Sequence, residues 1–311
     1  MTAPARIVSL LASGTELTCA LGLGGRLVGR SHECDFPAWV ERLPVVSRPT
    51  FDIGGSSREI DGRVRERLRQ GLPLYEVDEQ LLVELSPDVL ITQTHCEVCA
   101  VSPADLAHGS PAKLSRTPLV ALHGSTTDEI LRGFVDAARV LGAPEAGERL
   151  VRELQSRTAE VAQRVQGLPR SRVACLEWIE PVFAMGNWGP ELVELAGGHN
   201  LFGKPGQHST TLSFEAVCEA DPDVLIVAPC GFGLERATQE MRWLGAQPGF
   251  RELRASRAGR VFVCDGNLYF NRSSPSLFET PEILAEMLHP AQFEPRHEGR
   301  AWRRWQAPTA A

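Results

Sequence analysis

Four of the eight cysteines come shortly after segments that have the composition of buried β-strands. They are Cys34, Cys96, Cys99 and Cys230, which follow the stretches 26–31, 89–94 and 224–229. In an open α/β sheet, ligands bind beyond the carboxyl ends of the strands. We therefore expect these four thiols to face one shared cleft and to be candidate metal ligands.

Two kinds of chemistry fit such a set of thiols. Four thiolates at one point suit tetrahedral zinc or an iron–sulfur cluster, whereas Cys96 and Cys99 alone form a C-x-x-C pair that can cycle as a dithiol. His32 and His95 lie beside these cysteines, and His208 lies in a Gly-rich loop, so their imidazoles are further candidates. The competing interpretation is burial as small apolar side chains, which we apply to Cys19, Cys175 and Cys218.

Aromatic side chains next to predicted strand ends form a second group of candidates. Trp178 directly follows the predicted strand 172–177, Trp188 opens a loop before a short helix, and Tyr269 follows the predicted strand 260–264. A large flat ligand binds best against rigid rings. Ordinary core packing explains the same residues equally well, so both possibilities stay open.

Three polar residues complete the candidate ligand-binding set. Thr15 and Glu16 lie in the predicted first helix, where backbone N–H groups and a hydroxyl could hold an anionic or amide edge of a ligand. Helix capping would also explain Thr15. Arg272 lies in another strand-to-helix turn and could pair with a ligand carboxylate or with an acid of the other lobe.

The elements that must position these residues alternate along the chain. Short β-branched runs at 6–11, 27–31, 89–92, 119–121, 172–177, 224–228 and 260–264 are separated by helical patterns, which is typical of βαβ units in a mainly parallel sheet. The phrase Ser-Pro-Asp-Val-Leu-Ile at 86–91 returns as Asp-Pro-Asp-Val-Leu-Ile at 221–226. We therefore predict an α/β protein with two similar lobes.

A helical region separates the predicted lobes. Apolar residues recur at helical spacing from 127 to 166, Thr126 or Thr127 can cap the start, and Gly142 and Pro144 should break or kink the run. The predicted organisation is an N-terminal α/β lobe at 1–125, a connecting helix at 126–166, a C-terminal α/β lobe at 167–290 and a basic, Pro-bounded tail at 291–311. A long helical connection limits the lobes to small relative motion.

Composition narrows the class of partner. The net charge of −7 argues against a nucleic-acid surface or an anionic membrane surface, and no apolar run is long enough to span a bilayer. The apolar stretch 7–23 is interrupted by polar residues, so we interpret it as strand, turn and helix rather than as an export signal. We therefore expect a cytoplasmic protein whose cysteines remain reduced.

Several segments together resemble a known family. Ile7-Val-Ser-Leu with Thr15-Glu16, Cys34-Asp-Phe-Pro, the two Pro-Asp-Val-Leu-Ile segments, Leu195-Ala-Gly-Gly-His-Asn and Asn271-Arg-Ser-Ser-Pro-Ser are similar to the helical-backbone (class III) periplasmic-binding-protein-like family for iron complexes and cobalamin. Within this family, the chain resembles the signal-less, cysteine-bearing cobalamin-binding branch. The resemblance implies two α/β lobes joined by a long helix, a metal chelate held between them, and delivery to an ABC transporter.

These observations leave three functions open. The first is binding of a metal chelate, with a corrinoid such as cobalamin as the expected ligand, Trp178, Trp188 and Tyr269 as stacking residues, and no catalysis. The second is a metal or iron–sulfur protein with zinc or a cluster on the four cysteines. The third is a thiol redox enzyme that uses Cys96 and Cys99. The absence of a P-loop or a G-x-S-x-G elbow disfavours other enzyme classes.

Overall fold

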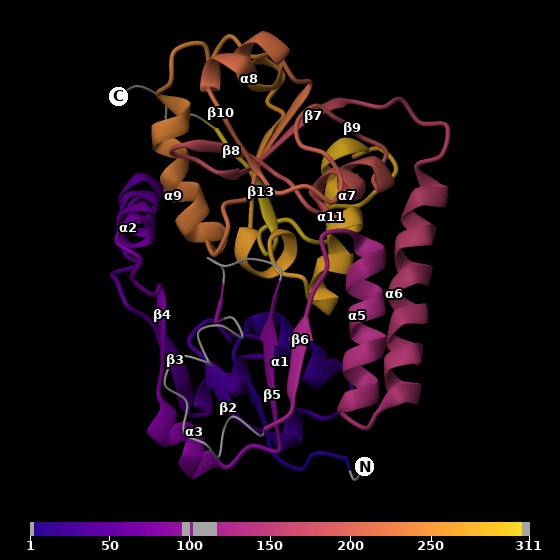
Figure 1. Ribbon diagram of the computed structural model, residues 1–311. Coiled ribbons are helices and arrows are strands. Elements are labelled where there is room, and N and C mark those ends of the chain that lie inside the picture. Colours follow the sequence, from indigo (N-terminus) through magenta and orange to yellow (C-terminus); the bar gives the residue numbers. More distant parts are fainter. Residues whose placement is uncertain (1–2, 95–99, 102–116, 307–311) are drawn as a thin grey trace. The chain divides into compact units, whose positions relative to one another are not determined.

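The computed structural model describes residues 3–94, 100–101 and 117–306, which fall into two compact units. Unit 1 comprises Met1–Gly55, Gly62–Leu154 and Ser273–Pro275, and unit 2 comprises Ser56–Asp61, Gln155–Arg272 and Ser276–Ala311. Each unit has its own sheet and its own covering helices (Figure 1). The α/β class expected from the alternating pattern is confirmed.

Unit 1 contains a six-stranded sheet in the order β4-β3-β2-β1-β5-β6. Every neighbouring pair is parallel except β3 with β4. The strands are β1 (Ile7–Ser9), β2 (Leu27–Ser31), β3 (Val45–Pro49), β4 (Tyr75–Val77), β5 (Val89–Gln93) and β6 (Leu119–Leu122), and the connecting helices include α1 (Ala12–Ala20) and α3 (Glu79–Leu85). Helix α2 (Ser57–Arg69) is divided, since its residues up to Asp61 belong to unit 2 and those from Gly62 belong to unit 1. Since β2 and β5 flank β1 on opposite sides, the strand order reverses at β1, which is where open α/β sheets bind ligands.

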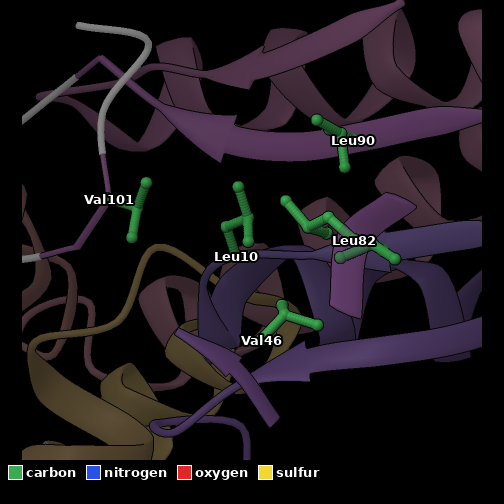
Figure 2. Close-up of a cluster of buried hydrophobic side chains, with 6 residues drawn as sticks. Leu10, Val46, Leu82, Leu90 and Val101 are labelled. Atoms are coloured by element: carbon green, nitrogen blue, oxygen red, sulfur yellow. The ribbon is translucent and has the colours of Figure 1, made fainter. Parts of the chain in front are cut away.

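Apolar side chains from the strands and from α3 fill the core of unit 1. Val8, Leu10, Val46, Leu82 and Leu90 are each at most 3% exposed and lie together in one cluster (Figure 2). β5 is buried along its whole length, as expected for a central parallel strand covered on both faces. This core holds β1, β3 and β5 in place and thereby fixes the loops that follow them.

Unit 2 contains a sheet in the order β10-β8-β7-β11-β12-β13, with the short β9 also paired to β7. β7, β11, β12 and β9 run parallel, whereas β8, β10 and β13 join through antiparallel pairs. The strands are β7 (Arg172–Trp178), β8 (Val182–Ala184), β9 (His199–Asn200), β10 (Thr210–Leu212), β11 (Val224–Val227), β12 (Val261–Cys264) and β13 (Trp302–Arg304). Its helices are α7 (Gly189–Leu195), α8 (Phe214–Ala220), α9 (Leu234–Gly245), α10 (Arg254–Arg257) and α11 (Thr280–Leu288), and α7 lies beside α11 (Figure 1).

The repeated Pro-Asp segment has the same structural role in both units. Asp88 accepts hydrogen bonds from the backbone N–H groups of Ala5 (2.8 Å) and Arg6 (2.9 Å), just before β1. Asp223 accepts one from the backbone N–H of Arg172 (2.9 Å), at the start of β7. In each unit, therefore, the aspartate ties its own strand to the amino end of the neighbouring central strand.

The helical region between the two sheets is broken where glycine and proline predict a break. α5 (Thr127–Val140) begins after Thr126, whose side chain accepts a hydrogen bond from Glu129 N (3.3 Å), and α6 (Pro144–Arg164) begins at the proline. The chain passes from unit 1 to unit 2 between Leu154 and Gln155, within α6. No helix in the described part of the chain is both long enough and apolar enough to cross a membrane.

The C-terminal stretch predicted as a tail contributes to unit 2. β13 pairs antiparallel with β12, and Trp302 is 4% exposed, with its ring 5.4 Å from that of Phe262. Phe293 is also buried. Besides the seven expected strands, the described residues form six that the sequence did not predict: β3, β4, β8, β9, β10 and β13.

Candidate functional site

The carboxyl edge of the unit 1 sheet brings several predicted residues together. Thr15 lies in α1, which follows β1, and Cys34 follows β2. Thr15 Oγ1 donates a hydrogen bond to Cys34 Sγ at 3.0 Å, and both side chains are buried. The N-cap position of α1 is Leu11, with no side-chain capping bond. Thr15 therefore does not cap the helix; it joins two neighbouring strand ends at the edge where ligands bind.

Two further predicted residues lie at this edge. Glu16 is only 4% exposed within α1. His32 directly follows β2, with its Nδ1 3.3 Å from Ser31 Oγ and its ring centroid 5.6 Å from that of Tyr75. Burial lowers the pKa of His32, although a hydrogen bond with the Ser47 backbone opposes the effect. The imidazole is therefore neutral at neutral pH, the form that can bind a metal.

The sequence reasoning did not select two other side chains at this edge. Phe36 follows Cys34 by two positions, and its ring is 45% exposed. His123 directly follows β6, with its Nδ1 3.4 Å from Thr94 Oγ1. Both could have been found by searching every loop that follows a predicted parallel strand.

At the carboxyl edge of unit 2, three side chains form what we call the aromatic stack: Trp178, Phe232 and Arg236. Trp178 ends β7 and is partly exposed, and its ring centroid lies 5.2 Å from that of Phe232 in the loop after β11. Arg236 Cζ from α9 lies 3.9 Å from the centroid of the Phe232 ring. Phe232 is 2% exposed, so its ring belongs to the core of unit 2 and contacts both neighbours. The expected position of Trp178 at the end of its strand is confirmed, and its contact with a ligand stays a prediction.

Cys230 and Glu177 lie next to the aromatic stack. Cys230 follows β11, its side chain is exposed, and its backbone N–H donates to the Glu177 carbonyl at 2.9 Å. Burial raises the pKa of the Glu177 carboxyl, against hydrogen bonds from the Ser209 side chain and the Gly186 backbone. Cys230-Gly-Phe232 has the same Cys-x-Phe spacing as Cys34-Asp-Phe36, so each unit places a thiol and a phenyl ring in the loop after a parallel strand.

The loop after β12 contains the other predicted residues of this edge. Asp265 caps a π-helical turn, η4 (Gly266–Phe270), and Asn267 Oδ1 accepts a hydrogen bond from Arg272 Nη2 at 2.8 Å. Tyr269 is 3% exposed and Arg272 is 6% exposed. Tyr269 therefore packs inside unit 2 and offers no open ring face for stacking, while Arg272 is fixed at the edge by its neighbours.

Trp188 has a different place from the one expected. β8 runs antiparallel to β7, with Leu176 opposite Ala184, so the loop after β8 leaves the sheet away from the carboxyl end of β7. Trp188 is 6% exposed, and its indole N–H donates to the Phe270 carbonyl at 2.8 Å. Pro190 lies in the first turn of α7 and Gly197 has a positive φ after it, as a local pattern can predict, but such a pattern does not give the direction of the preceding strand.

The four-cysteine site does not receive support from the described residues. Cys34 belongs to unit 1 and Cys230 to unit 2, while Cys96, Cys99 and His95 lie outside the described residues. Cys175 and Cys264 are fully buried, which raises their pKa values well above the ordinary thiol range. Cys175 therefore behaves as the small core residue that its pattern predicts.

One group of possible metal donors exists in the described part of the chain: Glu282, Glu286 and His297. His297 Nδ1 lies 2.6 Å from Glu286 Oε1, and Arg157 Nη2 lies 2.9 Å from Glu282 Oε2. Hydrogen bonds with Glu279 and Glu286 raise the pKa of His297 to about 9. At neutral pH the imidazole is therefore protonated and pairs with Glu279 and Glu286, so in this structure the group forms an ion-pair network.

Comparison with known proteins is consistent with this geometry. The sequence matches the periplasmic binding protein family over residues 7–268. The chain belongs to this family. The vitamin B12-binding protein of Vibrio cholerae is 23% identical over 292 residues, which cover 92% of this chain and 90% of that protein. An ABC transporter substrate-binding lipoprotein of Bacillus subtilis, YvrC, described as uncharacterized, is 22% identical over 94% of this chain and 82% of its own length.

Solved structures share the fold. A periplasmic heme binding protein from Pseudomonas aeruginosa has a TM-score of 0.70 at 21% identity, covering 93% of this chain and 94% of that one. The periplasmic vitamin B12 binding protein BtuF of Vibrio cholerae has a TM-score of 0.66 at 20% identity, covering 93% and 98%. The resemblance to the periplasmic binding protein family noted from the sequence is confirmed, and members of this family are ligand carriers rather than enzymes.

The expectation of a cytoplasmic protein is wrong. The family is that of periplasmic binding proteins, and one relative is a lipoprotein. Residues 7–20 do fold as β1, a turn and α1, as predicted, but a folded segment carries no information about the compartment. The argument that the cytosol keeps the cysteines reduced therefore no longer applies, and a zinc or iron–sulfur site gains no support from these relatives.

Proposed function

We propose that the chain is the substrate-binding protein of an ABC transporter and that its cargo is a planar metal chelate, with a cobalamin-type corrinoid as the preferred candidate. Membership of the periplasmic binding protein family supports the general role. The relatives from Vibrio support the cargo, because they are described as vitamin B12-binding proteins. Zinc, an iron–sulfur cluster and thiol redox catalysis have no comparable support.

The observation that carries this proposal is the aromatic stack of unit 2. Trp178 packs against the buried Phe232 ring, which Arg236 also contacts, so the Trp178 ring is supported by the core while remaining partly exposed. A rigid ring loses little conformational entropy on binding and can cover a large apolar face. A macrocyclic chelate presents such a face, whereas a small hydrophilic solute does not.

In unit 1, we propose that Phe36 supplies a second apolar contact and that the Thr15–Cys34 pair holds its loop in place. Phe36 is 45% exposed and lies two residues beyond Cys34. Cys34 is itself fixed by the 3.0 Å hydrogen bond from Thr15. Glu16 and Arg272 are buried charged groups near strand ends, and we propose that they set the electrostatic potential at the binding edges.

Heme is the second candidate cargo, and His32 is the observation that favours it. A neutral imidazole is a common ligand of heme iron, and burial keeps His32 neutral. A heme-binding protein is also among the structures with the same fold. Replacement of His32 by Ala should weaken hemin binding and leave cyanocobalamin binding little changed if the imidazole binds iron.

The experiment that tests the proposal is titration of the purified protein with cyanocobalamin and, separately, with hemin, followed by visible absorption and calorimetry. Loss of the Trp178 ring should weaken cargo binding by roughly 10- to 100-fold, since burying and stacking one indole contributes about 1.5–3 kcal/mol. The matched control is Trp305→Ala, because Trp305 packs on Phe250 and its backbone bonds Val261, at the opposite end of β12. Failure of both chelates to bind, or equal losses in Trp178→Ala and Trp305→Ala, would contradict the proposal.

A further inference from the structure

A buried carboxylate in unit 2 organises the last part of the chain. Glu286 of α11 is 1% exposed at its side chain and accepts four hydrogen bonds. The donors are the backbone N–H groups of Arg296 and His297, each at 3.1 Å, His297 Nδ1 at 2.6 Å and Trp302 Nε1 at 2.8 Å. Three residues of segment 296–302 are therefore attached to one side chain.

The charges around His297 are balanced within unit 2. Besides Glu286, His297 faces Glu279, whose Oε2 lies 3.5 Å from Nε2, and Glu282 is the third acid of the group. Arg157 pairs with both Glu279 and Glu282, and Arg300 Nη2 lies 3.7 Å from Glu279. Three carboxylates and three cations thus form a closed network that needs no added ion, and the imidazolium is its most buried cation.

This network is connected to the carboxyl edge through β13. The Asp265 backbone N–H, just after β12, donates to the Ala301 carbonyl at 2.8 Å. Asp265 Oδ1 accepts from the N–H groups of Asn267 (3.0 Å) and Leu268 (2.8 Å), and Asn267 Oδ1 holds Arg272. A continuous series of hydrogen bonds therefore runs from Glu286 through segment 296–302 to the loop that fixes Arg272.

We propose that segment 293–304 is a brace for the binding edge of unit 2, and that Glu286 and His297 are positioning residues for the loop 265–272. The expected effect on cargo binding rests on the proposed function, whereas the expected effect on the loop 265–272 does not. β13 has only three residues and lies at the edge of the sheet, and so short a strand has little stability of its own. The ion-pair network supplies the missing attachment, and without it Asp265 loses its partner at Ala301.

Hydrogen exchange followed by mass spectrometry tests the brace without any ligand. In His297→Gln, the amides of 262–272 should exchange at least 10-fold faster than in the wild type, together with those of 294–304. The control is Glu294→Gln, because Glu294 is 82% exposed and lies outside the network. Acceleration confined to 294–304, with 262–272 unchanged, would overturn the proposal.

A second variant covers the possibility that His297→Gln does not fold. Trp302→Phe keeps a ring against Phe262 and removes only the Nε1–H bond to Glu286, so it should accelerate exchange in 262–272 by a smaller factor. If this folded variant exchanges like the wild type throughout 262–272, Glu286 does not position the loop.

Cargo binding gives a readout that a purely structural role would not change. At pH 7.5, His297→Gln should bind cyanocobalamin or hemin, whichever the wild type binds, about 5- to 10-fold more weakly, although the aromatic stack is intact. The wild-type affinity should fall between pH 8 and 10 as His297 loses its proton, and that of His297→Gln should not. If the wild type binds neither chelate, the proposed function fails, and the hydrogen-exchange result alone decides whether segment 293–304 acts as a brace. If the wild type and His297→Gln show the same dependence of affinity on pH, the brace is contradicted.

Discussion

His297 should make the stability of unit 2 depend on pH in the neutral to alkaline range. Hydrogen bonds with Glu279 and Glu286 raise its pKa from the usual 6.5 to about 9, and the side chain is 5% exposed, so solvent screening is slight. A rise of this size corresponds to about 3 kcal/mol of folding free energy. Because the folded pKa lies above the unfolded one, this contribution is complete below pH 6.5 and is lost as the pH rises through 9.

Urea unfolding at a series of pH values from 6 to 9.5 measures this contribution. Five of the six tryptophans belong to unit 2, so tryptophan fluorescence reports mainly on its unfolding. In the wild type, the free energy of unfolding should fall by about 2–3 kcal/mol across this range. His297→Gln should be less stable by about 3 kcal/mol at pH 6 and should lose little more on going to pH 9.5.

Two comparisons separate this effect from other titrations. The buried thiols of Cys175 and Cys264 also lower the stability at alkaline pH, because burial raises their pKa values in the folded state. This component is common to the wild type and to His297→Gln. His199→Gln serves as the matched control, because His199 is 61% exposed beside Glu194. A wild-type stability that is constant from pH 6 to 9.5, or a His297→Gln curve parallel to it, would refute the reasoning.

Three further predictions concern a hydrogen bond of Asp223, the close packing around Gly186 and the exposure of the cysteines. Asp223→Ala should lower the free energy of unfolding by about 1–2 kcal/mol in urea titrations, because the N–H at the start of β7 loses its partner; an unchanged midpoint would contradict this role. Gly186→Ala should lower the melting temperature, since an added Cβ would lie 2.4 Å from the backbone nitrogen of residue 209, whereas Gly62→Ala, which meets nothing within 4 Å, should not. Among the described cysteines, Cys230 should react fastest with iodoacetamide and Cys175 only on unfolding; rapid native labelling of Cys175, measured by peptide mass spectrometry, would count against the packing.

The parallel strands and the helix boundaries could be predicted because their signals are local. β2 begins and ends where the pattern places it, at 27 and 31, and β7 extends the predicted 172–177 by one residue. α5 begins after its threonine cap, and α6 begins at Pro144. In each case the periodicity, the cap or the proline acts within one turn or one strand, so neighbouring residues carry the information.

The candidate site could be predicted only in part. Trp178 is the last residue of a central parallel strand, and Cys34 and Cys230 follow such strands by three residues, so their place at the carboxyl edge followed from the fold class. Trp188 and Tyr269 follow the same sequence rule but are buried. Phe36 and Phe232 were not selected. Each lies two residues after a cysteine, and this spacing indicates nothing until the conformations of the two loops are known.

The amino-acid sequence alone determined the α/β class, the two related halves and the loops from which a ligand could be bound, because these depend on short-range periodicity and on a repeated Pro-Asp segment. The tertiary structure alone decided that β8 runs antiparallel and turns Trp188 into the core, and that Glu286 gathers Arg296, His297 and Trp302 around one carboxylate. Strand direction and buried ion pairs depend on contacts between residues far apart in the chain, and no local pattern encodes them.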